Sequence, residues 1–122
     1  MIELAAVRKL ALSFPGAEEL PHFHLVSFRL YNKIFATLWV KENRAMLKLS
    51  LVDQSAFCSI DGEAFRPVPG GWGARGATFV ELGKVRKDMF KDAITTAYRR
   101  VASKKKRGSV KSKAGKRKSP TP

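Results

Sequence analysis

Near the start of the chain, apolar residues recur at helical spacing. Val7, Leu10 and Phe14 fall at i, i+3 and i+7, which places them on one face of a helix. Pro15-Gly16 comes next, and this pair ends a helix because proline cannot continue it. The pattern therefore predicts one amphipathic helix over residues 2–14.

Further along, the period changes from helical to two. The stretch at 33–40 alternates between two sets of side chains, and both sets are apolar, which predicts a central strand covered on both faces. Strands are also expected at 26–31 and 45–50, with hairpin turns at 31–33 and 41–44, so that three strands form an antiparallel meander. Residues 17–24 are expected to be a polar connection. The two expected faces of the central strand are Ile34, Ala36, Leu38 and Val40 on one side, and Phe35, Thr37 and Trp39 on the other.

Beyond the meander, residues 50–62 have the features of a short helix. Ser50 can cap its first turn, Asp53 suits the positive end of the helix dipole, and Gly62 suits the other terminus. The segments 64–69 and 77–82 are expected to be strands. The first of them is short or at an edge, because its two prolines cannot donate to a ladder.

A last apolar stripe predicts a helix over residues 85–102. The whole pattern has the order α-βββ-α-ββ-α, an α+β fold with an antiparallel sheet of about five strands and helices packed on it. We expect one domain over residues 1–102. Residues 103–122 hold one aliphatic side chain larger than alanine, Val110, and we expect them to form a disordered tail.

Charge is distributed unevenly along the 122 residues. The net charge is +14, and residues 103–122 carry nine of the 24 Lys and Arg residues but none of the ten Asp and Glu residues. Nucleic acid is the polyanion that such a basic tail most commonly meets. The alternative is a solvated extension that only keeps the protein in solution.

Composition also bears on the compartment. Cys58 is the single cysteine, so a disulfide within the chain is impossible. The N-terminal residues lack the pattern of a signal peptide, and no stretch approaches the ~18 apolar residues of a membrane span. These observations predict a cytoplasmic protein with no membrane partner.

The glycine-rich segment Gly71–Gly76 matches the letters G-x-G-x-x-G. A dinucleotide fingerprint must follow a strand and open a helix, whereas this segment leads into the β-prone residues 77–82. We therefore interpret it as a flexible hairpin loop that carries Trp72 and Arg75. Trp72 either folds back as a lid on the core or stands with Arg75 at a tip that can touch a phosphate backbone.

Several strings and their order resemble the MmcQ/YjbR-like family over about residues 3–102. These strings are "FPGAEE", "FRLYNKIFATL", "MLKLS", "GWGARGATFVEL" and "AYRRVA". The resemblance implies a small α+β domain with two hairpin wings, described as a double-wing fold, and a DNA-binding role. The sequence departs from the family pattern in its basic tail and in "HFH" at 22–24, where a bulky residue such as tryptophan is expected.

Metal binding and catalysis have little support in the sequence. His22, His24 and Cys58 could supply three zinc ligands, but a structural site wants four, and no matching Cys or His spacing is present. Cys58 lies among apolar residues of a short helix, where an inert thiol is the common case. We expect no cofactor, no metal and no enzymatic activity.

The favoured hypothesis is a non-enzymatic DNA-binding protein that acts through phosphate-backbone electrostatics with low sequence specificity. RNA is a less favoured partner, and the alternative is a small protein- or metabolite-binding domain with a pocket between the open face of the sheet and the glycine loop. The oligomeric state is not predicted. The candidate nucleic-acid-binding residues are Lys33, Lys41, Arg44, Trp72, Arg75, Lys104, Lys105, Lys106, Arg107, Lys111, Lys113, Lys116, Arg117 and Lys118.

Overall fold

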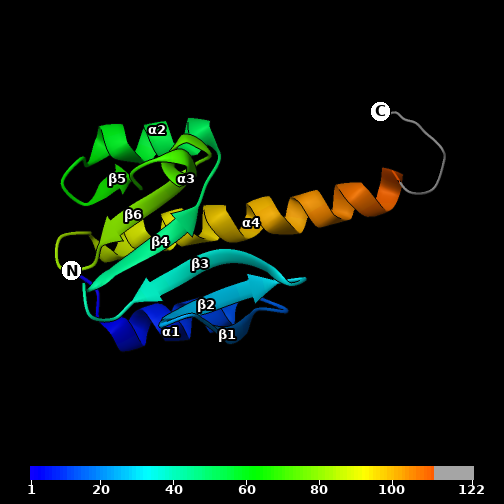
Figure 1. The fold of residues 1–122 in the computed structure, drawn as a ribbon, viewed down its shortest axis with the longest axis horizontal. Coiled ribbons are helices and arrows are strands. Elements are labelled where there is room, and N and C mark those ends of the chain that lie inside the picture. Colours follow the sequence, from blue (N-terminus) through cyan, green and yellow to red (C-terminus); the bar gives the residue numbers. More distant parts are fainter. Residues whose placement is uncertain (112–122) are drawn as a thin grey trace.

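The computed structural model describes residues 1–111 and has the α+β architecture expected from the sequence (Figure 1). Six strands form a single antiparallel sheet in the order β1-β2-β3-β4-β6-β5. In chain order the elements are α1 (Leu4–Ser13), β1 (Glu18–His22), β2 (Leu25–Leu30), β3 (Lys33–Trp39), β4 (Arg44–Lys48), α2 (Leu51–Ile60), β5 (Phe65–Pro67), α3 (Gly71–Ala74), β6 (Ala77–Glu81) and α4 (Lys87–Lys111).

The predicted meander is confirmed as β2, β3 and β4. Tyr31 and Asn32 connect the first two strands, and both have left-handed backbone angles, with φ of 53° and 64°. Two left-handed residues in a two-residue loop match the right-handed twist of the strands that they join. The short strand β5 lies at the edge of the sheet, as its prolines predicted.

The sheet has six strands where about five were expected, because the segment expected to be a polar connection forms β1. Its register pairs Glu18 with Arg29 of β2. On the opposite side of the strand, Glu19 accepts a 2.6 Å bond from Arg8 of α1. The charged side chains and Pro21 give residues 18–22 a low strand propensity, and the strand forms because of its neighbours. Proline is tolerated because β1 is an edge strand.

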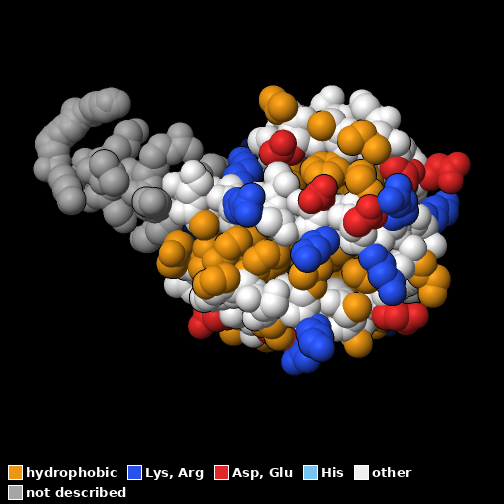
Figure 2. Space-filling model, turned by 180° about the vertical axis from the view of Figure 1, so that it is seen from behind, with side chains coloured by type: hydrophobic (Ala, Val, Ile, Leu, Met, Phe, Trp, Pro, Cys, Tyr) orange, Lys and Arg blue, Asp and Glu red, His pale blue; other side chains and the backbone are white. Residues whose placement is uncertain are grey.

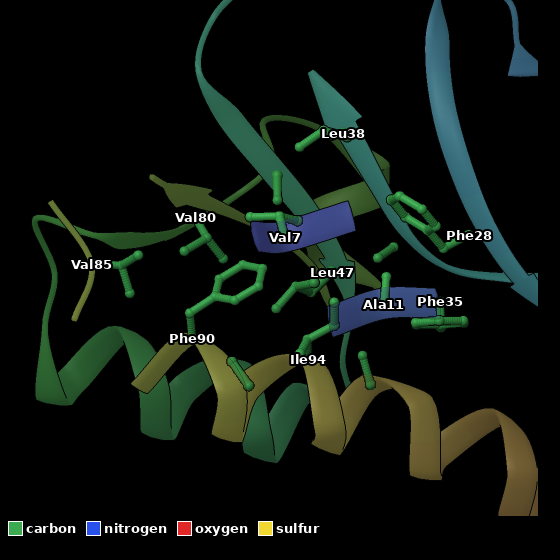
Figure 3. Packing of buried hydrophobic residues seen from close by; sticks show 14 of the residues in the cluster. Val7, Ala11, Phe28, Phe35, Leu38, Leu47, Val80, Val85, Phe90 and Ile94 are labelled. Atoms are coloured by element: carbon green, nitrogen blue, oxygen red, sulfur yellow. The ribbon is translucent and has the colours of Figure 1, made fainter. Parts of the chain in front are cut away.

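The core lies between one face of the sheet and the helices α1, α2 and α4. Figure 3 shows Phe90 and Ile94 of α4 pointing toward Leu47 and Val80 of the sheet. All four are fully buried. Phe57 of α2 contributes from the same side, because its ring packs 5.2 Å from that of Phe65 of β5. The opposite face of the sheet is left without a helical layer.

Alternation along β3 is broken by a bulge, which corrects the predicted faces of this strand. Phe28 pairs with Ala36 while Arg29 pairs with Ile34, so Phe35 is the extra residue. Phe35 therefore joins Ala36 in the core instead of lying opposite it. Ile34 lies on the outer face, apart from Ala36 and Leu38, with which it was grouped. Val40, expected on a covered face with them, is exposed beyond the end of the strand.

The predicted cap of α2 is confirmed. Ser50 Oγ accepts a 3.1 Å hydrogen bond from the backbone N–H of Asp53. We expect Ser50→Ala to lower the free energy of unfolding by about 1 kcal/mol, because one N–H of the first turn loses its acceptor. Urea denaturation would measure this loss. Ser55→Ala, at an exposed position within the same helix, is the control and should change stability by less than about 0.5 kcal/mol. Equal losses in both variants would contradict the capping role.

α4 continues past residue 102, its expected end, to Lys111. Lysine and arginine are good helix formers, and the first proline of the tail is Pro120, so a helix already started on the core can propagate into the basic segment. The structure describes helical backbone over residues 103–111, and the disordered tail expected there stays a prediction. The expectation for residues 112–122 lies outside the described residues. No helix among the described residues is both long and apolar enough to cross a bilayer.

Candidate functional site

The outer face of the sheet carries a small apolar cluster on the side opposite the core helices α1, α2 and α4. Met46, Ala77 and Phe79 are its buried members, with Trp39 and Val68 packed against them. The ring of Trp39 stands edge-on to that of Phe79, with the ring centres 5.0 Å apart. Trp39 Nε1 also donates a 2.9 Å hydrogen bond to Thr37 Oγ1, which fixes the indole on the sheet. The cluster gives this face a rigid aromatic surface.

A cavity of about 580 Å³ lies over this surface, within the range of ~300–1,000 Å³ typical of small-ligand pockets. The sheet contributes Leu25, Ile34, Trp39 and Met46. The turn between β1 and β2 contributes Phe23, and α3 contributes Trp72. This position agrees with the pocket that the alternative hypothesis expected between the open sheet face and the glycine loop. The lining is mainly apolar and aromatic.

A second cavity, of about 330 Å³, adjoins the first and has a different chemistry. It is lined by Lys48, Trp72, Arg75, Ala77 and Arg100, so that Lys48 and Trp72 border both cavities. The three cations come from β4, from the end of α3 and from α4. Among the described residues none of these cations forms an ion pair. Their positive charge is therefore unbalanced by neighbouring carboxylates.

On the face of the molecule seen in Figure 2, basic side chains do not gather in the same way. Figure 2, the molecule seen from behind, shows Lys and Arg side chains spread among acidic and apolar ones. Four ion pairs lie within the described part of the chain, and two of them share the carboxylate of Glu81. The cavity that contains Lys48, Arg75 and Arg100 thus differs from such mixed surface, because its cations stand together without an acid. We call these three residues the basic triad.

The glycines of the G-x-G-x-x-G segment shape the loop that carries Trp72 and Arg75. Gly70 and Gly76 have left-handed backbone angles, with φ of 85° and 109°. A Cβ atom on Gly73 would stand 1.8 Å from the carbonyl oxygen of Val68, so no larger residue fits there. The segment leads from Gly76 into β6, as predicted. Gly73 and Gly76 of the segment therefore have conformational reasons that involve no cofactor.

The expected flexible hairpin loop is instead the one-turn helix α3, held in place by Gln54. The buried side chain of Gln54 donates from Nε2 to the carbonyl oxygens of Gly73, at 3.0 Å, and Ala77, at 3.1 Å. These bonds tie the loop to α2. Trp72 is 58% exposed, which overturns its interpretation as a lid on the core. It projects from an anchored turn at the border of the two cavities.

The structure brings together some of the predicted nucleic-acid-binding residues and separates others. Trp72 and Arg75 share the smaller cavity, and its other cations, Lys48 and Arg100, are not among the predicted residues. Lys33 starts β3 at the same end of the sheet, but it lines neither cavity. Lys41 lies in the turn at the opposite end of the strand.

Arg44 is engaged within the protein. Its Nε lies 3.3 Å from Glu81 Oε2, too poorly aligned for a hydrogen bond, and its guanidinium stands 4.5 Å from the centre of the Phe79 ring. Arg66 shares the same carboxylate through a 2.6 Å bond. Because Arg44 is half-buried and paired at the end of the sheet away from the basic triad, we leave it out of the site.

The predicted tail residues fall in two groups. Lys104, Lys105, Lys106, Arg107 and Lys111 belong to α4, whose backbone runs past Arg100 and extends beyond the sheet (Figure 1). The helix that bears this basic sequence thus leaves the domain close to the basic triad. The remaining predicted residues, Lys113, Lys116, Arg117 and Lys118, lie outside the described residues.

The residues weighed as zinc ligands lie on different layers. His22 and His24 line the large cavity on the outer face, whereas Cys58 on α2 packs against the core. Burial raises the pKa of the Cys58 thiol, which favours its protonated, unreactive form. In the described part of the chain no three His, Cys, Asp or Glu side chains come close enough to hold a metal ion.

Comparison with known proteins gives a family from one search and a fold from another. A family model described as YjbR matches residues 12–100. The search of curated proteins found no match. Among solved structures, the chain is similar to the crystal structure of the Deinococcus radiodurans protein DR2400, described as a DUF419 domain. The TM-score is 0.68 at 16% identity over 97% of this chain and 84% of that one. At such identity the likeness concerns the fold alone.

Proposed function

The chain belongs to the YjbR family, and from the geometry of its open sheet face we propose that it is a non-enzymatic nucleic-acid-binding protein. DNA is the partner we favour over RNA. In this proposal the basic triad holds the phosphate backbone, and the basic part of α4 and the tail add further phosphate contacts. We place the protein in the cytoplasm together with its nucleic acid.

The observation that carries the proposal is the basic triad itself. Three cations from three elements surround one cavity, and no carboxylate of the described residues pairs with them. Like charges gathered in this way repel each other, and an anionic ligand relieves the repulsion. A polyanion fits better than a single anion, because the basic sequence of α4 continues from the same end of the sheet.

Low sequence specificity follows from the elements available. α1, α2 and α4 up to residue 102 pack on the core, and α3 is a single turn, so none of these segments is presented as a recognition helix for the major groove. The continuation of α4 to Lys111 offers lysine and arginine, which suit phosphate contacts. Contacts to phosphate oxygens position a protein on nucleic acid without reading its bases. We therefore expect similar affinities for DNA of different sequence.

A second candidate function is the binding of a small anionic metabolite. The 580 Å³ cavity favours it, because its size suits a compact organic ligand and the adjoining basic triad would hold an acidic group. A free ligand would leave the basic sequence of α4 and the tail without a role. For that reason we rank this function second.

The salt dependence of binding tests the first proposal. The full chain would be titrated into a fluorescein-labelled duplex, with anisotropy recorded at several salt concentrations. We expect log affinity to fall linearly with log salt, with a slope of roughly −3 if only the triad meets phosphates and about −11 if all nine tail cations join it. A slope near zero, or no binding at low salt, would contradict the proposal. Tight binding of small organic anions without duplex binding would favour the second candidate.

A further inference from the structure

We propose that the large cavity binds one unstacked nucleobase while the basic triad holds the phosphate of the same nucleotide, so that the protein prefers single-stranded to double-stranded nucleic acid. The inference rests on the proposed function and specifies its ligand. Lys48 and Trp72 line both cavities. An aromatic compartment and a cationic compartment that share a wall match a nucleotide, which joins a planar base to a phosphate.

Two exposed aromatic side chains border the apolar compartment. Trp72 is 58% exposed and Phe23 is 89% exposed. Neither side chain is part of the core. Burial of apolar surface contributes a free energy of about 25 cal/mol per Å², which these exposed rings do not gain in the free protein. A base stacked on such a ring recovers this burial, and base–aromatic stacking tolerates every base because each has a flat π-face. The third aromatic residue, Trp39, is held on the sheet at the cavity.

The backbone at Phe23 supports a role for its ring. Phe23 is the first residue of the two-residue loop between β1 and β2, and its φ is 59°. Glycine adopts this conformation at no steric cost and is favoured there, whereas a bulky side chain is strained. Such strain clusters at functional sites. Tyr31, the first residue of the loop between β2 and β3, has a similar φ of 53°, so the role of Phe23 is inferred from its place at the cavity as well. The strained backbone at Phe23 places an aromatic ring at the mouth of the cavity, facing solvent.

Access explains the preference for single strands. In a duplex the base is stacked and paired, so it can enter a cavity only after an unstacking cost of a few kcal/mol. A base in a single strand lacks most of that cost and can be turned into the apolar compartment while its phosphate meets the triad. A duplex would contact the triad and the basic helix through its backbone alone.

The test uses the full chain and three ligands: a 12-nucleotide oligo(dT), a 12-base-pair duplex and the free mononucleotide dTMP. We expect the oligonucleotide to bind more tightly than the duplex and to quench tryptophan fluorescence, since both tryptophans line the cavity. Trp72→Ala should weaken oligo(dT) binding roughly 5- to 150-fold, the range for loss of one base stack, and change duplex binding less than twofold. The control is Ile60→Ala on α2, an exposed apolar residue away from both cavities, which should leave both affinities unchanged.

Four other outcomes would overturn the inference. If Trp72→Ala weakens both ligands equally, or if the duplex binds as tightly as the single strand, the base pocket is refuted while the proposed function stands. If dTMP binds as tightly as oligo(dT), the ligand is a free nucleotide and not a strand. Failure of the protein to bind any nucleic acid would refute the inference and the proposed function together. Thermal melting of the variants confirms that they are folded.

Discussion

Replacing Gly76 by alanine is expected to lower the free energy of unfolding by at least about 3 kcal/mol. Its φ of 109° is a conformation that L-residues rarely adopt, and a Cβ atom there would stand 1.8 Å from the carbonyl oxygen of Leu49. The Gly76 carbonyl accepts hydrogen bonds from Leu49 N–H, at 3.2 Å, and from Thr78 Oγ1, at 2.9 Å. Relief of the clash would disturb both bonds. Urea denaturation followed by circular dichroism would measure the loss.

The matched control lies in the same motif. Gly71 has open space around the position of a Cβ atom and no left-handed backbone angle, so Gly71→Ala should be neutral or stabilise the protein by up to about 1 kcal/mol. The contrast separates a conformational requirement at Gly76 from a general need for glycine in the loop. Equal effects of the two substitutions would contradict this account of the G-x-G-x-x-G segment.

Removing the basic triad by Lys48→Ala, Arg75→Ala and Arg100→Ala is expected to produce the largest loss of nucleic-acid affinity. Three phosphate contacts contribute about 2.7 to the slope of log affinity against log salt. Over the tenfold range from 1 M to 0.1 M salt, this part of the slope corresponds to a factor in affinity on the order of 10² to 10³. The triple variant should lose that factor at about 0.1 M salt. The loss should occur with duplex and single strand alike, because both present phosphates. Fluorescence anisotropy across a salt series would measure it.

A control with the same change of net charge separates the site from bulk electrostatics. Lys41, Lys84 and Lys87 are exposed at the end of the sheet away from the triad, and their joint replacement by alanine also removes three positive charges. We expect this variant to bind within a few-fold of the unaltered protein. If the two triple variants lose affinity equally, net charge alone accounts for binding and the triad is not a site.

Much of the fold could be predicted because its determinants are local. The helical stripe that ends at Pro15-Gly16, the β-prone run that forms β3 and the Ser50 cap each depend on residues within a few positions of one another. The two faces of β3 could not be predicted in this way, because the bulge at Phe35 arises in the pairing with β2. β1 was missed because its stability comes from pairing with β2 and from the Arg8–Glu19 ion pair, and neither is visible in residues 18–22 alone.

The site was predicted in part. Trp72 and Arg75 could be predicted as site residues because an aromatic and a basic residue occur together in a glycine-rich segment. Lys48 and Arg100 carry no local signal, because each is one lysine or arginine among many. The register that places Lys48 opposite Ala77, together with the packing of α4, brings them to Trp72. Gln54 was missed for the same reason, since its two acceptors are 19 and 23 residues away.

The family resemblance and the excess of positive charge can thus be read from the residues alone. The kinds of element and most of their order can be read as well, because they follow from side-chain spacing over one or two turns. Which cations meet, which tryptophan faces solvent and where the two cavities join emerge from the folded chain. Those relations depend on strand register and helix packing between distant segments, and a shift of one residue in register would have turned Lys48 to the other face of the sheet.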